Sequence, residues 1–338
     1  MTQRLGRWLE KLWYGNQPPN PLLGIAAQFF SWIVQTRAYL YRKEFFTSSQ
    51  LSAPVIAIGN LTVGGTGKTP LTIRVVEILR QHGLKPGIVS RGYGGQRHSA
   101  PVVVDPHSDP ALYGDEPVLI ADRTGCPVCV FKNRSLAAQH LIQNLDCDVI
   151  IADDALQHYR LKSDIEIAVI DGLRGFGNER MLPQGPLREP IHRLEKVDLI
   201  VQNSGKLISN EYFSMSLSAR KILNLHDSQR SIELADLIGA DVVAIAGTGN
   251  PESFFKLLVN NGLSIEAHQF SDHHPFRSSD LEFVGDRLLL MTEKDAVKCR
   301  AFAKQNYWFL PVDATLPNSF EDRLLTLVEL LKNGQKTS

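Results

Sequence analysis

Residues 55–70 read VIAIGNLTVGGTGKTP, and this stretch decides how the chain folds. Its β-branched start, residues 55–58, predicts a short buried strand. Three glycines then give the backbone the freedom that a tight turn needs, at Gly64, Gly65 and Gly67. Pro70 follows and is well suited to the first turn of a helix. A strand, a glycine-rich turn and a helix in this order predict a phosphate-binding loop, because the N–H groups of the turn and the helix N-terminus attract an anion.

The residues of this loop predict binding of a nucleoside triphosphate. Lys68 is expected to reach the β- and γ-phosphates, and the hydroxyl of Thr69 is expected to bind Mg²⁺. The usual loop, G-x-x-x-x-G-K-[ST], opens with glycine, whereas Thr62 stands at that position here. A plain glycine turn beside a surface lysine is the alternative, and the flanking strand and helix argue against it. The predicted nucleotide contacts are Thr62, Val63, Gly64, Gly65, Thr66, Gly67, Lys68 and Thr69.

A second apolar run, residues 149–152, ends in Asp153 and Asp154. A strand that delivers an acid at its carboxyl end is what enzymes with a phosphate loop use to hold Mg²⁺. Adjacent side chains of an extended chain point to opposite sides, so one acid can serve the metal while the other reaches elsewhere. The alternative is an ordinary turn at the strand end, because such turns also favour aspartate. The phosphate loop in the same domain favours the interpretation of these acids as a Mg²⁺ site.

The overall composition bounds the class of protein. The chain has 338 residues, 43% of them hydrophobic, which is enough for two domains with sizeable cores. Lysine plus arginine and aspartate plus glutamate both number 36, so no general positive charge indicates a nucleic-acid partner. Four cysteines in a chain of this length indicate a reducing compartment. Cys126 and Cys129 have the spacing of a metal or redox pair, but without a second pair of ligands beside them buried thiols are the better interpretation.

The N-terminal segment has the features of a helix that lies in a membrane surface. Residues 22–34, LLGIAAQFFSWIV, are apolar but too short for a bilayer span, which needs about 20 residues. No clear small-residue cleavage site follows, which argues against a signal peptide. In a helix over 21–46, polar side chains share one narrow stripe, and residues 1–45 carry six basic residues against two acidic ones. The pattern favours an in-plane membrane helix, with packing on the globular domain or on a partner as the alternative.

From residue 71 onward, strands and helices are predicted to alternate, which indicates an α/β fold. The predicted strands are 87–90, 102–105, 127–131, 149–152, 198–202, 241–246, 288–292 and 307–311, and the predicted helices are 71–81, 135–144, 251–260 and 320–331. We expect an N-terminal helical segment at 1–46, a phosphate-loop domain with a mainly parallel sheet at 47–218, and a smaller α/β domain at 219–333. The active site is expected in the cleft between the two α/β domains.

Several polar loops have more than one interpretation when spacing alone is considered. Residues 90–95, SRGYGG, form either a mobile lid or a plain turn, and residues 182–190, LPQGPLREP, form a rigid loop that presents Arg188. Asp115 and the glutamate after it stand at a predicted helix start, where capping explains them best. The triplet at 272–274, Asp-His-His, suits a metal or an acid–base role.

The motifs GNLTVGGTGKTP, SRGYGG, GDEP, ADDALQH, LPQGPLREP, SDHHPF and TEKDAVK follow one another here in the order seen in the tetraacyldisaccharide 4′-kinase (LpxK) family. The chain resembles this family from its N-terminal apolar segment to about residue 310. Members of the family phosphorylate the lipid A disaccharide precursor and are peripheral proteins of the cytoplasmic face of the bacterial inner membrane. The family uses threonine or serine at the first loop position, so Thr62 fits its pattern.

The resemblance implies roles for residues on the nucleotide side. Lys68 and Thr69 match the family's phosphate and Mg²⁺ contacts. Asp153 and Asp154 match its acidic pair at the metal, and Gln157 and His158 complete that motif.

The resemblance also implies roles on the acceptor side. Asp115 matches the acid that is paired with His273 to activate the sugar hydroxyl, and this replaces capping as its expected role. The two residues are expected to meet across the domain cleft. Arg188 matches the arginine at the transferring phosphate. Tyr93 matches the aromatic residue of the glycine-rich lid, and we assign it to the nucleotide.

We therefore expect a peripheral membrane enzyme that uses ATP and Mg²⁺, binds no nucleic acid and works as a monomer. The resemblance implies phosphoryl transfer to the 4′-hydroxyl of a tetraacylated glucosamine disaccharide 1-phosphate, which gives the 1,4′-bisphosphate.

Two other classes of protein are weighed against this one. A P-loop GTPase or metallochaperone would use Cys126 and Cys129 as its metal handle, but it needs an N-K-x-D element, and the nearest match, residues 293–295, lacks the asparagine. A membrane-bound nucleotide-binding scaffold would be indicated if loss of Asp115 left turnover intact.

Overall fold

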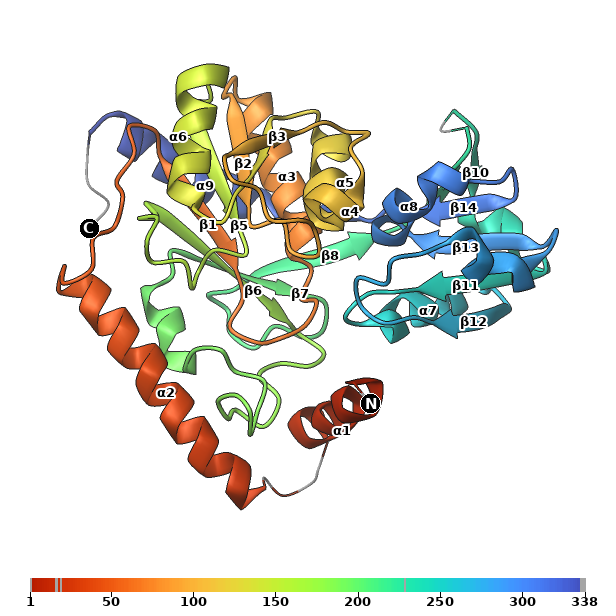
Figure 1. Cartoon of the computed structure of the whole chain (residues 1–338), viewed down its shortest axis with the longest axis horizontal. Helices are drawn as coiled ribbons and strands as arrows, with labels where there is room; N and C mark the ends of the chain where they lie inside the picture. The colour runs from red at the N-terminus through yellow and green to blue at the C-terminus, as the bar shows by residue number, and fades with distance from the viewer. Residues whose placement is uncertain (1, 16–17, 19, 228, 335–338) are drawn as a thin grey trace. The chain divides into compact units, whose positions relative to one another are not determined.

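The computed structural model of the chain describes residues 2–15, 18, 20–227 and 229–334. They form two compact units, each built from segments that are far apart in the sequence (Figure 1). Unit 1 takes the residues up to 90, then 133–216, and those from 315 onward, whereas unit 2 takes 91–132 and 217–314. Both units contain helices and a mainly parallel sheet, so the predicted α/β fold class is confirmed.

A parallel sheet forms the centre of unit 1. Its strands run in the order β8-β7-β6-β1-β5-β2, and each neighbouring pair is parallel. The strands are β1 (Val55–Gly59), β2 (Pro86–Ser90), β5 (Val149–Asp153), β6 (Ile165–Asp171), β7 (Leu199–Asn203) and β8 (Phe213–Ser218). β1, β2 and β5 are buried along their whole length, as continuous apolar runs are in a sheet covered on both faces. Because β1 is an inner strand, the loop that follows it is anchored in the core of the unit.

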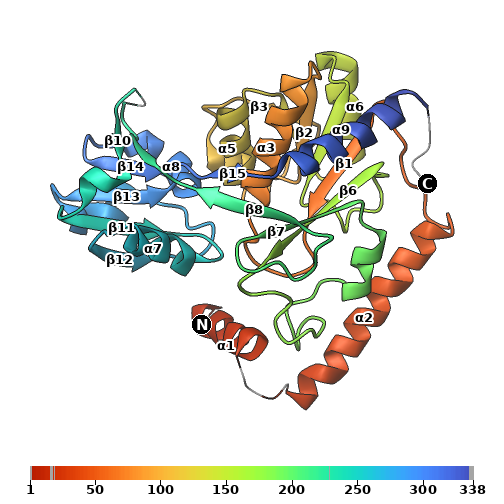
Figure 2. The same cartoon turned by 180° about the vertical axis from the view of Figure 1, so that it is seen from behind.

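Three long helices complete this α/β arrangement in unit 1, namely α3 (Lys68–Gln81), α6 (Arg134–Leu145) and α9 (Asn318–Lys332). α3 packs against β1, β2 and β5, and α6 packs against β2. Pro70 stands in the first turn of α3, as predicted, and the helix ends just before Gly83, whose φ is 76°. α9 is the last helix of the chain and belongs to unit 1 (Figure 2). A 3-10 helix, η1 (Ile191–Lys196), precedes β7.

A second sheet organises unit 2, with the strand order β10-β9-β14-β13-β11-β12. β11 is parallel to β12 and β13, β13 is parallel to β14, and β9 is antiparallel to β14 and β10. The strands are β9 (Lys221–Asn224), β10 (Ser231–Glu233), β11 (Val242–Ala246), β12 (Ile265–Gln269), β13 (Leu288–Thr292) and β14 (Tyr307–Leu310), with helix α7 (Pro251–Asn260) between β11 and β12. Alternate residues of β11 enter different hydrophobic clusters, because successive side chains of a strand point to opposite faces.

Residues 91–132 form the other part of unit 2. They contain β3 (Val102–Val104), α4 (Pro110–Tyr113), α5 (Asp115–Thr124) and β4 (Val128–Val130), and β3 pairs with β4 in antiparallel fashion. α5 packs on α8 (Glu293–Cys299). An ion pair of 2.9 Å between Arg123 and Glu293 joins these two helices. This packing explains why the segment groups with the C-terminal half of the chain.

The units differ from the contiguous domains expected from the sequence, 47–218 and 219–333, in two places. Residues 91–132 belong to unit 2, and α9 belongs to unit 1. The sequence analysis also did not predict β6, β8, β9, β10 or β12. In β6 the polar side chain of Glu166 interrupts the apolar pattern.

The N-terminal segment forms two helices of unit 1, α1 (Thr2–Tyr14) and α2 (Pro21–Arg42). The Nε1–H of Trp13 donates to the carbonyl of Pro183 at 3.0 Å, and the Asn20 side chain caps α2 by accepting from Leu22 N at 2.9 Å. Large apolar side chains of α2 are exposed, at Leu22, Ile25, Phe29, Trp32 and Ile33. Within the described part of the chain, no helix combines the length and the hydrophobicity that crossing a membrane requires.

Candidate active site

The loop between β1 and α3 has the backbone geometry expected of a phosphate loop. Gly64 and Gly67 have φ values of 109° and 94°, in the region that favours glycine. A Cβ atom at Gly67 would lie 2.8 Å from Nδ2 of Asn203, and that same amide donates to the carbonyl of Thr66 at 3.2 Å. The absence of a side chain at Gly67 therefore leaves room for Asn203, at the end of β7, to hydrogen-bond to the loop. Helix α3 begins directly after this glycine, at Lys68.

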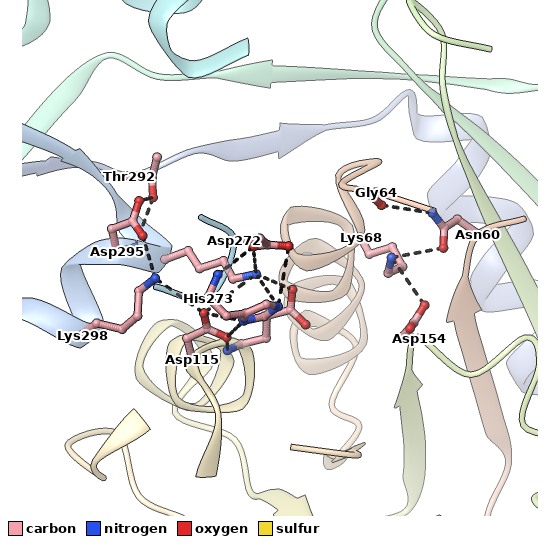
Figure 3. A network of polar contacts seen from close by, with 12 residues as sticks. Asn60, Gly64, Lys68, Asp115, Asp154, Asp272, His273, Thr292, Asp295 and Lys298 are labelled. Atoms are coloured by element: carbon pink, nitrogen blue, oxygen red, sulfur yellow. Dashed lines mark hydrogen bonds and ion pairs between the residues drawn. The ribbon is translucent and has the colours of Figure 1, made fainter. Parts of the chain in front are cut away.

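Asn60 fixes the loop from within. Its side chain is fully buried, and its Nδ2 donates to the carbonyls of Thr62 at 2.8 Å and Gly64 at 3.4 Å. Its Oδ1 accepts from Nζ of Lys68 at 3.2 Å, as Figure 3 shows. One side chain thus sets both the path of the loop and the position of the lysine. Asn60 is not among the residues predicted from the sequence, although its place directly after a buried strand is a usable signal.

The two aspartates that end β5 have different partners. Asp153 is 2% exposed, and its Oδ1 accepts from the hydroxyl of Thr72 at 3.4 Å. Asp154 has a φ of 47°, and its carboxylate lies 3.4 Å from Nζ of Lys68 and 3.3 Å from the guanidinium of Arg188. Burial acts to raise the pKa of Asp154, but the charges of Lys68, Arg188 and Arg134 outweigh it and hold the pKa below its ordinary value. Asp154 is therefore an ionised acid that forms ion pairs with Lys68 and Arg188 beside the phosphate loop.

The proline-rich segment 182–190 carries Arg188 to this cluster. It runs beside the phosphate loop, with Arg188 N donating to the carbonyl of Leu61 at 2.6 Å and Val63 N donating to that of Pro186 at 2.9 Å. These backbone hydrogen bonds explain why a rigid loop presents the arginine here.

Glu189 organises a second set of contacts next to Arg188. It is 2% exposed and accepts from Nε2 of Gln157 at 2.8 Å and from the hydroxyl of Tyr159. Nε2 of Gln157 also donates to the carbonyl of Asn60 at 3.1 Å, so this group is connected to the phosphate loop. The sequence analysis did not single out Glu189, because a buried glutamate is recognisable only once its partners are known.

The donor set on unit 1 fits Mg²⁺ that is bound together with a nucleotide. Mg²⁺ prefers oxygen ligands and is usually held by one or two carboxylates, substrate phosphates and water. Asp153 supplies a carboxylate, Thr69 in the first turn of α3 supplies a hydroxyl, and Gln157 has a carbonyl oxygen that its amide hydrogen bonds leave available. Among the described residues, no group of three or more His, Cys, Asp or Glu could hold a metal ion by itself. Phosphate oxygens of the nucleotide would complete the ligands of such an ion.

In unit 2, close backbone packing positions Asp115. Gly114 has a φ of 93°, and a Cβ atom at Gly95 would lie 2.7 Å from Gly114 N, so the glycine-rich turn at 92–95 rests on the start of α5. Gly114, and not Asp115, is the N-cap residue of α5. Asp115 instead occupies the first helical position, is 4% exposed, and accepts from Glu116 N at 2.9 Å.

Asp115 and His273 are paired, as the resemblance implies. Nδ1 of His273 lies 3.0 and 2.9 Å from the two carboxylate oxygens of Asp115 (Figure 3). His273 has a φ of 56°, and its ring lies against Tyr93 with the centroids 5.0 Å apart. Both residues belong to unit 2, whereas the sequence placed Asp115 in the domain 47–218 and His273 in the domain 219–333. Tyr93 also belongs to unit 2, where it contacts the histidine, and its assignment to the nucleotide stays a prediction.

The hydrogen bond and the nearby charges shift the pKa values of this pair in opposite directions. Burial acts to raise the pKa of Asp115, but the hydrogen bond from His273 and the charges of Lys294 and Lys298 lower it below its ordinary value. The hydrogen bond to Asp115 raises the pKa of His273, against burial and the charge of Lys294. An ionised acid that orients a more basic histidine is an arrangement that can accept a proton from a hydroxyl group.

The cysteines lie in the hydrophobic interior. Cys126, Cys129, Cys147 and Cys299 are all buried. Burial raises the pKa of Cys129 to about 12, which leaves it protonated and unreactive near neutrality.

Comparison with known proteins gives one consistent family. A family model described as tetraacyldisaccharide-1-P 4′-kinase, LpxK, matches residues 19–329. A tetraacyldisaccharide 4′-kinase from Methylobacillus flagellatus is 47% identical over 327 residues, which cover 96% of this chain and 97% of the relative. One from Nitrosococcus oceani is 46% identical over 319 residues, 94% of each chain. A crystal structure of LpxK from Aquifex aeolicus in complex with ATP matches with a TM-score of 0.74 and 25% identity, covering 91% of this chain and 99% of that one.

The resemblance inferred from the ordered motifs is thereby confirmed over nearly the whole chain. The phosphate loop, the paired acids and the Asp115–His273 pair stand in a fold shared with a kinase that was solved with ATP. The chain belongs to the tetraacyldisaccharide 4′-kinase family.

Proposed function

We propose that this protein transfers the γ-phosphoryl group of ATP to the 4′-hydroxyl of a tetraacylated glucosamine disaccharide 1-phosphate. The product is the 1,4′-bisphosphate precursor of lipid A. The observation that carries the proposal is the Asp115–His273 hydrogen bond, because a protein that only binds or hydrolyses a nucleotide has no need of a base aimed at an alcohol. The protein is proposed to act as a monomer.

Lys68 and Arg188 are the proposed catalytic cations on the donor side. The transferring phosphoryl group passes through a loose transition state whose equatorial oxygens carry the charge, so fixed cations stabilise it. Both side chains lie within 3.4 Å of Asp154, which holds them side by side at the phosphate loop. The loop residues 62–69 are proposed to enclose the phosphates with their backbone N–H groups.

Mg²⁺ is the proposed cofactor, held by Thr69, Asp153 and, through its carbonyl oxygen, Gln157. When bound, it would neutralise charge on the β- and γ-phosphate oxygens. Asp154, which also matches the family's metal site, is instead proposed to act mainly through Lys68 and Arg188, because both cations already surround its carboxylate.

On the acceptor side, Asp115 and His273 are proposed to remove the proton from the sugar hydroxyl. A carboxylate that binds Nδ1 favours the tautomer with the proton on Nδ1, which leaves Nε2 as the proton acceptor. The His273 side chain is 20% exposed and that of Asp115 only 4%, so the histidine is the member that a substrate can reach. Asp115 would then stabilise the imidazolium that forms.

We also propose that α2 holds the protein at the inner-leaflet surface of the inner membrane, where the lipid substrate resides. Leu22, Ile25, Phe29 and Trp32 are between 63% and 78% exposed, which is unusual for large apolar side chains on one helix. An exposed apolar and aromatic face with basic flanking residues is typical of helices that lie in the membrane interface.

A GTPase or metallochaperone function has less support. Asp295, in the segment nearest to an N-K-x-D element, is fully buried and accepts from the hydroxyl of Thr292 at 2.7 Å and from Gly247 N at 2.9 Å. A carboxylate engaged in this way does not face a guanine base.

The position of the new phosphate tests the proposed reaction. The protein is incubated with ATP, Mg²⁺ and the tetraacylated disaccharide 1-phosphate, and the product is analysed by proton–phosphorus correlation NMR. The proposal predicts a new phosphomonoester coupled to the proton on C4′. Phosphorus at any other carbon, or release of free phosphate alone, would contradict it.

A further inference from the structure

The motif TEKDAVK, residues 292–298, is not used by the donor-side chemistry described above. It covers the end of β13 and most of α8, and it brings two lysines, Lys294 and Lys298, to the Asp115–His273 pair. Figure 3 shows Lys298 between Asp295 and Asp115.

Lys294 lies beside the ring nitrogen of His273 that would accept the proton. Its Nζ is 3.5 Å from Nε2 of His273 and 3.9 Å from Oδ2 of Asp115. Two further acids share the ammonium, with Glu116 Oε1 at 3.1 Å and Asp272 Oδ1 at 3.5 Å. The side chain is 16% exposed, so water screens these interactions only in part. Although burial opposes it, these acids raise the pKa of Lys294, which keeps the ammonium charged.

The start of α8 is built so that Lys294 stays in this place. The hydroxyl of Thr292 caps the helix by accepting from Asp295 N at 3.1 Å, and the carboxylate of Asp295 accepts from that hydroxyl and from Gly247 N. Lys298 forms an ion pair of 2.7 Å with Asp295, and its Nζ lies 5.1 Å from the centre of the Phe276 ring. With α8 fixed in this way, the ammonium of Lys294 does not have to be ordered when the substrate binds.

The groups that face His273 come from several elements, and their charges oppose one another. α5 contributes Asp115 directly and Glu116 through Lys294, and Asp272 lies next to the histidine in its own loop. The cations Lys294 and Lys298 come from α8, the second of them 3.8 Å from Asp115.

Tyr93 and Gly94 also lie beside the His273 ring. The ring of Tyr93 lies against it, and a Cβ atom at Gly94 would be 3.6 Å from Nδ1. Among these neighbours, Lys294 is the cation next to Nε2 itself.

We propose that Lys294 is a positioning residue whose ammonium, beside Nε2 of His273, disfavours a proton on that nitrogen, so that more of the Asp115–His273 pair is ready to accept the proton of the sugar hydroxyl. A cation next to Nε2 disfavours a second proton on the ring, while Asp115 favours the proton on Nδ1. Without Lys294, the hydrogen bond to Asp115 would raise the pKa of His273 further. Lys294 limits that effect. The inference rests on the proposed function of the pair as the acceptor-side base.

The pH dependence of kcat/KM tests the proposal with Lys294→Met and Lys294→Arg. Removing the cation raises the pKa of His273, so the acid limb should move to higher pH by about one unit, the lower end of what a charge within about 4–6 Å produces. At pH values below the midpoints of both proteins, kcat/KM of Lys294→Met should be about tenfold lower than that of wild type. At pH values above both midpoints, the two values should agree within a few-fold. Lys294→Arg keeps the charge and should restore the wild-type limb. Lys256→Met, which removes an exposed lysine of α7 in the same unit, should not move it.

The variant Glu116→Gln should shift the acid limb of the pH profile in the opposite direction. It removes a negative charge near the ring and the closest partner of Lys294, so the acid limb should move to lower pH. NMR titration of His273, assigned with the variant His273→Gln, measures the same shifts without turnover. A Lys294→Met variant that loses the same factor at every pH, or that leaves the pKa of His273 unchanged, would overturn the proposal.

The controls separate this inference from the proposed function. If Asp115→Ala and His273→Ala keep wild-type activity, the pair is not the base and the proposed function fails on the acceptor side. If both lose activity while Lys294→Met keeps the wild-type pH profile, the pair stands and only the role of Lys294 is refuted.

Discussion

Replacing Lys68 by alanine removes one positive charge from the phosphate loop and no part of the core. Nζ of Lys68 lies 3.2 Å from Oδ1 of Asn60 and 3.4 Å from Oδ1 of Asp154, and its side chain is 14% exposed. Asp154 keeps Arg188 at 3.3 Å, so the substitution leaves this acid with a partner. Because Oδ1 of the buried Asn60 loses its donor, we expect the free energy of unfolding to fall by about 1–3 kcal/mol. In contrast, kcat should fall by about 10²–10³ or more, because the transition state loses a preorganised cation.

The assay measures transfer of label from γ-labelled ATP to the acceptor lipid at saturating substrates, with the thermal midpoint measured in parallel. Lys332→Ala is the matched control, since it removes a lysine that pairs with Asp148 at 3.0 Å on the surface of the same unit. It should leave kcat unchanged. If Lys68→Ala stays within a few-fold of wild type, the assignment of the phosphate loop is refuted. If its thermal midpoint collapses together with its activity, the lysine supports the fold.

Further outcomes follow from the acceptor-side pair, the buried network and α2. Asp115→Ala and His273→Ala should each lower kcat, and the double variant should be about as slow as the slower single one, because interdependent groups act as one unit; fully multiplicative losses would indicate separate roles. Since the hydrogen bond to Asp115 raises the pKa of His273, kcat/KM should fall with decreasing pH around a midpoint above that of an ordinary histidine, and a midpoint below it would contradict the pairing. Asp295→Ala leaves the nearly buried Lys298 without its closest acid, so equilibrium unfolding should show a loss of about 3–5 kcal/mol, whereas Glu252→Ala, which breaks an exposed pair, should cost less than about 1 kcal/mol. Trp32→Glu should weaken co-sedimentation with anionic vesicles, and Gln35→Glu, which adds the same charge at another exposed position of α2, should weaken it much less; equal effects would mean that charge alone matters.

Local sequence patterns were sufficient for much of unit 1. The apolar run before the phosphate loop and the one before Asp153 are inner strands, as predicted, because long apolar stretches have few alternatives to burial. The helix at 251–260 was predicted with the bounds that the structure has, since a proline begins it. β6 and β12 were missed because each carries polar side chains, such as Glu166 and His268, that weaken the strand signal.

Local sequence patterns did not predict which distant segments of the chain pack together. Chain order places residues 91–132 with the phosphate loop, yet the packing of α5 on α8 assigns them to the other unit. The roles of Asn60, Glu189 and Lys298 depend on partners that are distant in sequence or in a loop of irregular path, so no local pattern distinguishes them from other polar residues. Asp115 shows the same limit, because spacing alone favoured helix capping and only the resemblance indicated His273.

We propose that the phosphate loop and the Asp115–His273 pair act on one phosphoryl group and deliver it to a sugar hydroxyl. The most direct measurement is the partition of label from γ-labelled ATP between the tetraacylated disaccharide and free phosphate, repeated with an acceptor that lacks only the 4′-hydroxyl. We predict that the label appears on the intact acceptor, and that neither the 4′-deoxy acceptor nor the Asp115→Ala variant with its ATP affinity preserved gives labelled lipid. Label that reaches the 4′-deoxy acceptor, or that is released only as free phosphate when ATP is bound, would contradict the account.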